Sequence, residues 1–143
     1  MRLWNFMMIP YLPDNQLRGQ WKECALIAYG IKKNGTPNHL LVNRVMNYPI
    51  DDFLSYCGMV KTELYRRRFR TTLESEQKIG LLGTYEKVEF PFKYWHTKEY
   101  LRSNMANLWE KHFMGVGKSR ISDDEWETLL RGYKEITGED YKI

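Results

Sequence analysis

The start of the chain combines an amine, a cation and a carboxylate, a set of groups that can carry out covalent catalysis. Arg2 directly follows the initiator Met1, and Glu23 is the single acidic residue in the interior of the first predicted helix. An α-amine has a reference pKa of about 7.7–8.0, far below the lysine value of about 10.4, so a useful fraction is neutral and nucleophilic at pH 7. A carboxylate beside that amine can transfer its protons. The Met1 amine and Glu23 are therefore the strongest functional lead in the sequence.

A helix over residues 14–29 must position this carboxylate. Asp14 follows a proline and is the expected N-cap, and Gly30 is expected to supply the left-handed turn at the C-terminal end. Apolar residues recur at spacings of four, three and four, which places them on one face of the helix. This apolar face consists of Leu17, Trp21, Cys24 and Ala28.

The same predicted helix carries polar residues that could face a substrate. Gln16, Gln20 and Glu23 form a second stripe, and Arg18 and Lys22 are a basic pair one turn apart. A solvated carboxylate that pairs locally on the helix surface is the alternative, purely structural interpretation of Glu23.

The apolar segment before this helix is predicted to anchor the terminus and not to export the chain. Asn5, Pro10 and Pro13 interrupt it, so it lacks the continuous apolar region of a signal peptide. Cys24 and Cys57 each fall on an apolar helical stripe, which indicates reduced, buried thiols and a cytoplasmic protein. The predicted anchors are Leu3, Trp4, Phe6 and Ile9.

A second helix is predicted from Pro49 to a run of three arginines at residues 66–68. Asp51 and Asp52 fall in its first turn, where negative charge is favourable. The arginine run is either a cationic helix end, favoured by the helix dipole, or a patch that contacts phosphates, and the sequence leaves both interpretations open. The core-facing residues of this helix are Phe53, Cys57, Val60 and Leu64.

Two more helices are predicted near the C-terminus. One covers residues 97–112, and the other begins at Ser122, where Ser-Asp-Asp-Glu is a capping box, and stops at Gly138. Residues 71–94 lack clean periodicity, although the alternation over residues 88–92 allows a short extended piece. The inward-facing residues of the helix over 97–112 are Leu101, Met105 and Leu108.

Length and composition indicate a single all-α domain over residues 1–143, a compact bundle of about three to five helices. The chain has 143 residues, of which 43% are hydrophobic and 15% aromatic, a globular composition without an apolar run long enough for a membrane span. His39, His96 and His112 are scattered, so neither a metal site nor a cofactor is expected. The net charge of +4 permits a polyanionic partner without demonstrating one.

The first helix resembles that of the pyrimidine-dimer DNA glycosylase family of phage endonuclease V and its bacterial branch. The segment Leu12–Glu23 reads LPDNQLRGQWKE, and its last three residues match the aromatic-basic-Glu triplet of the family. The MRLW opening and the YLP turn are similar to the bacterial branch, and two shorter similarities follow at residues 39–40 and 107–111. The likeness is good over the first 24 residues and looser to about residue 70.

The resemblance implies a monomeric, all-helical base excision repair enzyme that acts on a flipped-out base of damaged double-stranded DNA. Its activities would be those of a glycosylase and an abasic-site lyase on pyrimidine dimers. Because Arg2 is too large for the usual removal of methionine, the amine of Met1 itself takes the nucleophile position, with Glu23 as the proton-transfer group. The implied DNA-binding residues are Arg2, Gln16, Arg18, Gln20, Lys22, Arg66, Arg67 and Arg68.

One departure from the family keeps two other functions open. Phage members carry a further Arg one turn past Glu23, where this chain has Ala25, Leu26 and Ile27. The first alternative is therefore a catalytically silent nucleic-acid-binding domain of the same fold. The second is a protein-interaction module built on the five tryptophans, most of which fall at core-compatible positions.

Overall fold

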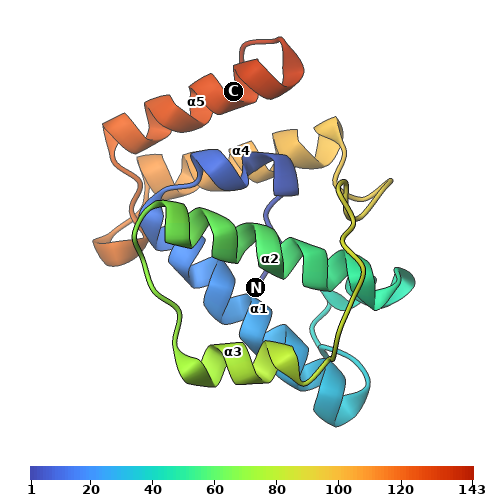
Figure 1. Ribbon diagram of the computed structural model, residues 1–143. Helices are drawn as coiled ribbons and strands as arrows, with labels where there is room; N and C mark the ends of the chain where they lie inside the picture. The colour runs from blue at the N-terminus through green and yellow to red at the C-terminus, as the bar shows by residue number, and fades with distance from the viewer.

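A computed structural model describes all residues from 1 to 143, and it contains helices and no strand. The five α-helices confirm the predicted all-α bundle (Figure 1). Of three short 3-10 helices, one precedes the first α-helix and two lie in connections between α-helices. The α-helices are α1 (Asp14–Asn34), α2 (Ile50–Arg66), α3 (Leu73–Gly80), α4 (Lys98–Phe113) and α5 (Asp123–Thr137), and the 3-10 helices are η1 (Phe6–Tyr11), η2 (Asn43–Asn47) and η3 (Gly117–Ser119).

The helices pack around a crossing of α1 and α2. In Figure 1, α4 and α5 lie above this crossing and α3 lies below it, against α1. The 3-10 helix η1 contacts both α2 and α5, so the start of the chain is enclosed by the bundle. None of the helices is long and apolar enough to cross a membrane.

The predicted core is confirmed. Residues predicted to face inward from three helices all lie in one buried hydrophobic cluster. Their helical spacings therefore do define the inward faces. Truncating such a side chain to Ala costs about 2–5 kcal/mol of stability, which makes α1, α2 and α4 a rigid frame for the terminus. The confirmed core residues are Leu17, Trp21, Cys24, Phe53, Cys57, Val60, Leu101, Met105 and Leu108.

The predicted ends of the first helix are wrong at both sides. Asp14 is the first helical residue and makes no capping bond, because Pro13 occupies the N-cap position. The helix continues past Gly30 to Asn34 and stops at Gly35, whose φ of 78° gives the left-handed C-cap. Gly30 has a different role: a Cβ there would lie 3.3 Å from Cα of Pro37, so the glycine allows the following loop to pack against the helix.

The segment over residues 71–94 contains a helix that the sequence analysis missed. Thr72 caps α3, and Ser75 of this helix accepts a hydrogen bond from Nε1 of Trp21 at 2.8 Å. The extended piece expected over residues 88–92 is not a strand. Its backbone instead bonds to side chains of α2, with the Val88 N–H donating to Oγ of Ser55 at 2.7 Å.

The remaining predicted boundaries are confirmed. Pro49 precedes α2, which ends at Arg66, and the helix predicted over residues 97–112 is α4. Ser122 and Glu125 form the predicted capping box of α5, and this helix ends at Gly138 with a φ of 77°.

Candidate active site

The first residues of the chain are folded into the protein. Leu3, Trp4 and Ile9 are buried, and Phe6 packs against the same core, so the four predicted anchors are confirmed. Met1 stays 37% exposed. The terminus is therefore held in place by its neighbours while its amine end remains open to solvent.

Side chains of α1 and α2 hold the backbone of this segment. Oε1 of Gln20 accepts a hydrogen bond from the Trp4 N–H at 2.7 Å, and Nε2 of Gln20 donates to the Arg2 carbonyl at 2.9 Å. The hydroxyl of Tyr56 donates to the Trp4 carbonyl and also bonds to Gln20. Gln20 was predicted to bind DNA, but it is only 1% exposed, and the structure places it between the terminus and α2.

Residues in and before α4 hold the other side of the segment. Oδ1 of Asn104 accepts from the Asn5 N–H at 2.7 Å, and the Tyr100 hydroxyl donates to the Leu3 carbonyl at 2.7 Å. The Phe6 N–H donates to Nδ1 of His96 at 3.0 Å. We call Gln20, Tyr56, His96, Tyr100 and Asn104 the N-terminal clamp, because together they bond the backbone of residues 2–6.

His96 serves this clamp as a neutral imidazole. Its ring is buried among aromatic side chains, including Phe92 at 4.9 Å and Tyr100 at 5.0 Å between centroids. Burial, with a smaller contribution from the charge of Arg44, lowers the pKa of His96 to about 3. A neutral ring can accept the Phe6 N–H at Nδ1, which a protonated ring could not.

Acid should weaken the fold through His96. Between the ordinary pKa of about 6.5 and the folded value of about 3, the unfolded chain binds a proton at His96 that the folded chain does not. The free energy of unfolding should therefore fall by about 1.4 kcal/mol for each pH unit of acidification from this residue alone. Urea denaturation of wild type and His96→Gln from pH 7 to pH 4 measures it. If the free energy of unfolding fell equally with pH in the two proteins, His96 would not be the cause of the acid sensitivity.

Glu23 lies against the backbone of the terminus. Its Oε2 is 3.4 Å from the Arg2 nitrogen, which donates to it, and it accepts a second bond from Nε2 of Gln20 at 3.2 Å. The amine belongs to Met1, the residue before Arg2, and it forms no ion pair with a carboxylate. Glu23 is therefore bonded to the backbone of the residue that follows Met1.

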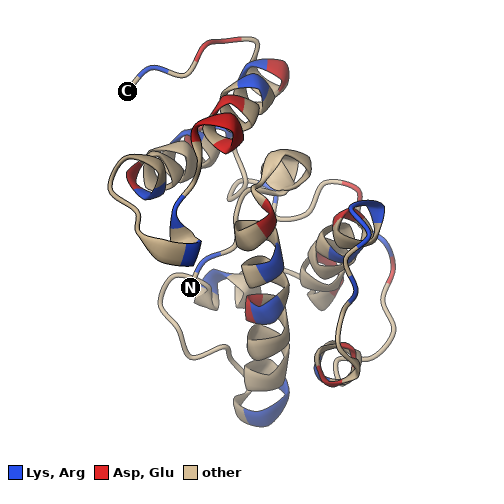
Figure 2. Ribbon diagram, turned by 90° about the vertical axis from the view of Figure 1, so that its left-hand side faces the viewer, with Lys and Arg blue, Asp and Glu red and all other residues tan.

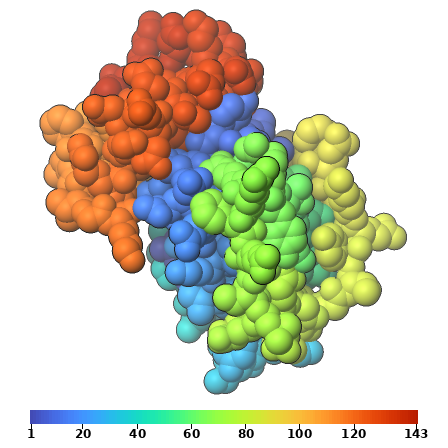
Figure 3. All heavy atoms as spheres, turned by 60° about the vertical axis from the view of Figure 1, so that its left-hand side comes forward, coloured from blue at the N-terminus to red at the C-terminus, as the bar shows by residue number.

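Glu23 opens into a cleft of about 370 Å³ between α1 and the region around η3. Figure 3 shows the orange chain that contains η3 projecting beside the blue surface of α1. The N-terminus lies beside α1, with Lys and Arg segments on α1 and on the neighbouring chain (Figure 2). Glu23 is the one acidic residue of a lining that includes Arg18, Lys22, Lys111 and Lys118.

Lys111 and Lys118 are site residues that the sequence analysis missed. They come from the end of α4 and from η3, and polar side chains of α1 hold η3 in place. Nδ2 of Asn15 donates to the Lys118 carbonyl at 2.8 Å, and Nε2 of Gln16 donates to the Ser119 carbonyl at 3.1 Å. Gln16, predicted to bind DNA, is thus buried beside the cleft, where its Oε1 has no hydrogen-bond partner.

The predicted arginine patch divides into three different environments. Arg67 donates to Glu63 at 2.7 Å, to Asp14 at 2.9 Å and to the Leu12 carbonyl at 2.6 Å, which ties α2 to the start of α1. Arg66 pairs with the same buried Glu63. Burial raises the pKa of the Glu63 carboxyl, but the hydrogen bonds from the two arginines outweigh it and hold that pKa below its ordinary value.

Arg68 is exposed, as Arg66 is, but unlike Arg66 and Arg67 it forms no ion pair. Arg18, on the rim of the cleft, lies over the Phe69 ring with its guanidinium carbon 5.1 Å from the ring centroid. Phe69, the residue after Arg68, therefore contacts a rim residue of the cleft, and Arg68 is the member of the run without an ion pair and so is available to contact a phosphate.

Arg67→Ala and Arg68→Ala should separate structure from DNA binding. Loss of the charged bonds of Arg67 should lower the free energy of unfolding by about 2–3 kcal/mol. Arg68→Ala should change it by less than about 0.5 kcal/mol but reduce the slope of log K against log salt by about one unit, the effect of one lost phosphate contact. Urea denaturation and DNA titrations over a salt series measure both. Equal stability losses in the two variants would contradict this division.

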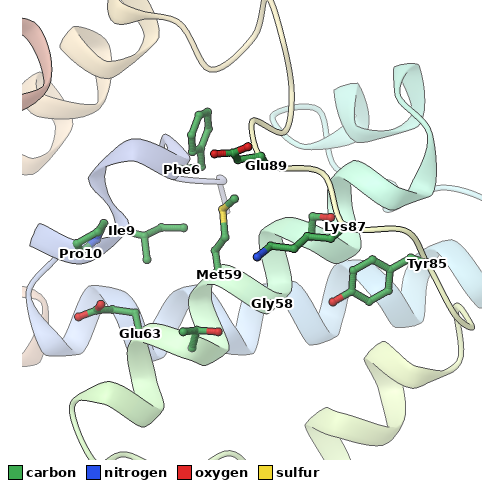
Figure 4. Close-up of a pocket in the computed structure, with 11 residues that line it drawn as sticks. Phe6, Ile9, Pro10, Gly58, Met59, Glu63, Tyr85, Lys87 and Glu89 are labelled. Carbon is green, nitrogen blue, oxygen red and sulfur yellow. The ribbon is translucent and has the colours of Figure 1, made fainter.

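A larger groove of about 700 Å³ lies elsewhere, between η1, α2 and residues 85–89. Figure 4 shows Lys87 reaching across it toward Met59, while the sulfur end of Met59 points toward Phe6 and Glu89. None of the residues predicted to act on DNA or to do chemistry lines this groove. The smaller cleft beside Glu23 is therefore the better candidate active site.

Comparison with known proteins adds evidence that is independent of this geometry. The family model described as pyrimidine dimer DNA glycosylase matches residues 1–77, which include the terminus, α1, α2 and Glu23. No curated protein and no solved structure matches the chain. Because the family model covers more than half of the 143 residues, the chain belongs to the pyrimidine dimer DNA glycosylase family.

Proposed function

We propose that the protein is a DNA glycosylase and abasic-site lyase for pyrimidine dimers, with the α-amine of Met1 as nucleophile and Glu23 as the proton-transfer group. The observation that carries the proposal is the bond between the Arg2 nitrogen and Oε2 of Glu23. It supports the proposal because it bonds the residue after Met1 to a carboxylate that lines a cleft with four cations. Family membership supplies the substrate class, damaged DNA.

The first stage of the proposed reaction removes the base. Glu23 takes a proton from the Met1 amine, whose nitrogen then attacks C1′ of the damaged nucleotide. The bond between C1′ and the base breaks, its electron pair leaves with the base, and the base takes up a proton. Glu23 gives the proton that it accepted to the leaving base, and the carboxylate that this restores stabilises the positive charge on the sugar.

The second stage cuts the strand. The nitrogen then loses one proton, and the bond between C1′ and O4′ breaks with its electron pair going to O4′, which takes up a proton. The C1′–nitrogen bond thereby becomes a protonated imine, which withdraws electrons from C2′. A base can then remove a C2′ proton, and the electron pair expels the 3′ phosphate. Glu23 is the carboxylate nearest to the terminus and serves in this transfer as well.

The cations of the cleft suit a DNA substrate. Lys22, Lys111 and Lys118 form no ion pairs with carboxylates of the protein, so they are free to contact phosphates. Arg2 lies over the Trp4 ring at 5.2 Å, beside the reacting terminus. Contacts of this kind fix the DNA in register without reading its sequence.

Borohydride trapping tests the proposed reaction, because borohydride reduces an imine to a stable amine. We expect a covalent adduct with duplexes that contain an abasic site and with ultraviolet-irradiated duplexes, and none with undamaged duplexes. DNA binding without any adduct would instead indicate the catalytically silent alternative. An adduct that forms with abasic DNA alone would support the lyase activity but contradict pyrimidine dimers as the substrate.

A further inference from the structure

The turn before α4 holds two bulky residues in a backbone conformation that they rarely adopt. Phe92 has a φ of 64° and Tyr94 a φ of 71°, both in the left-handed region. For bulky side chains this conformation is strained, and it persists only where surrounding contacts enforce it.

Three anchors enforce this turn. The buried Phe92 donates its N–H to Asp52 at 2.8 Å, and the Tyr48 hydroxyl donates to the Lys93 carbonyl at 2.6 Å. The guanidinium of Arg44 donates to the Tyr94 carbonyl at 3.4 Å. The result is a fixed turn from which the side chain of Tyr94 extends into solvent, with the residue 79% exposed.

Two cations without acidic partners lie at this turn, one of them over the exposed Tyr94 ring. Nζ of Lys93 lies 5.3 Å from the centroid of the Tyr94 ring, and the guanidinium carbon of Arg44 lies 5.7 Å from the Trp95 ring. Neither Lys93 nor Arg44 forms an ion pair. An exposed aromatic ring with two unpaired cations at the same turn matches a nucleic acid, whose bases stack and whose phosphates are anionic.

The turn is connected to the candidate active site through a short series of contacts. The rings of Trp95 and Tyr100 are 6.0 Å apart, and the Tyr100 hydroxyl donates to the Leu3 carbonyl at 2.7 Å. Leu3 follows Arg2, whose nitrogen bonds to Glu23. Trp95 of the turn and Leu3 of the terminus therefore contact the same side chain, that of Tyr100.

We propose that Tyr94, Lys93 and Arg44 form a second DNA-contact site, which we call the Tyr94 platform. The Tyr94 ring stacks on an unpaired base that flanks the lesion, while Lys93 and Arg44 contact the adjoining phosphates. Only a base outside the duplex stack presents a free face to an exposed ring, so the platform favours DNA that is already opened at a lesion. The inference rests on the damaged-DNA substrate of the proposed function.

A duplex with a tetrahydrofuran abasic analogue and 2-aminopurine at successive flanking positions tests the platform. Wild type and Tyr94→Phe should quench the fluorescence at one flanking position, because both present an aromatic ring. Tyr94→Ala should lose this quenching and bind with a Kd raised by about 5- to 150-fold, the range for one lost base–aromatic stack. Tyr29→Ala is the matched control, since Tyr29 is an exposed tyrosine with lysines over its ring on another part of the surface.

The outcomes separate the platform from the proposed chemistry. Unchanged Kd and quenching in Tyr94→Ala, or an equal loss in Tyr29→Ala, would overturn the platform even if wild type forms the borohydride adduct with abasic DNA. Quenching that depends on the Tyr94 ring, in a wild-type protein that forms no adduct, would support the platform and contradict the proposed reaction. Circular dichroism melting of each variant verifies that the fold is retained.

Discussion

Glu23→Gln should lower the single-turnover rate on abasic and dimer-containing DNA by about 10²–10⁴-fold, the usual contribution of a general acid–base group. The amide keeps an oxygen that can accept the bond from the Arg2 nitrogen, so the terminus should stay in place. What the variant loses is the negative charge and the ability to take a proton. DNA affinity should be retained, because the substitution leaves all the cations of the cleft in place.

The control for this variant is Glu127→Gln, which neutralises an exposed carboxylate of α5 outside the cleft. Rates for the two variants and wild type are compared at saturating DNA, with Kd measured separately on the uncleavable tetrahydrofuran duplex. A Glu23→Gln enzyme that turns over at the wild-type rate would remove Glu23 from the mechanism.

Acetylation of the Met1 amine should abolish the trapped adduct. The acetyl group converts the amine into an amide, which is neither basic nor nucleophilic at pH 7. The N-terminal clamp bonds only to residues 2–6, so the melting temperature and DNA affinity of the acetylated protein should be retained.

A chain extended by one glycine provides a second test of the terminus. It keeps a free amine but moves it by about 3.8 Å, and it should lose most of the trapping. Trapping at the wild-type level in the acetylated protein would show that another amine attacks the sugar.

The fold could be predicted wherever local patterns decide it. Apolar spacing identified the inward faces of α1, α2 and α4, and the capping box at Ser122 located the start of α5. Two glycines could both have ended α1, and only tertiary packing distinguishes them: Gly30 faces Pro37, whereas Gly35 takes the left-handed turn. The eight-residue α3 buries no side chain completely, so it left no apolar stripe to find.

The site was predictable only in its first part. Met1, Arg2 and Glu23 belong to one sequence motif, and the structure brings Arg2 and Glu23 together. The N-terminal clamp comes from remote segments, as with Asn5 and Asn104, which are 99 residues apart and have no shared pattern. Arg67 shows the opposite limit: its residue type predicts a phosphate contact, but a buried carboxylate and backbone carbonyls take its donors.

The most direct test of the Met1 amine as nucleophile is to identify the residue that carries the trapped DNA. Wild type is reacted with an abasic duplex under borohydride, the adduct is digested with nuclease and protease, and the modified peptide is sequenced by mass spectrometry. If the amine of Met1 is the nucleophile, the sugar remnant will be attached to the α-nitrogen of Met1. Attachment to the side chain of a lysine, of which Lys22, Lys111 and Lys118 are nearest to the cleft, would contradict it.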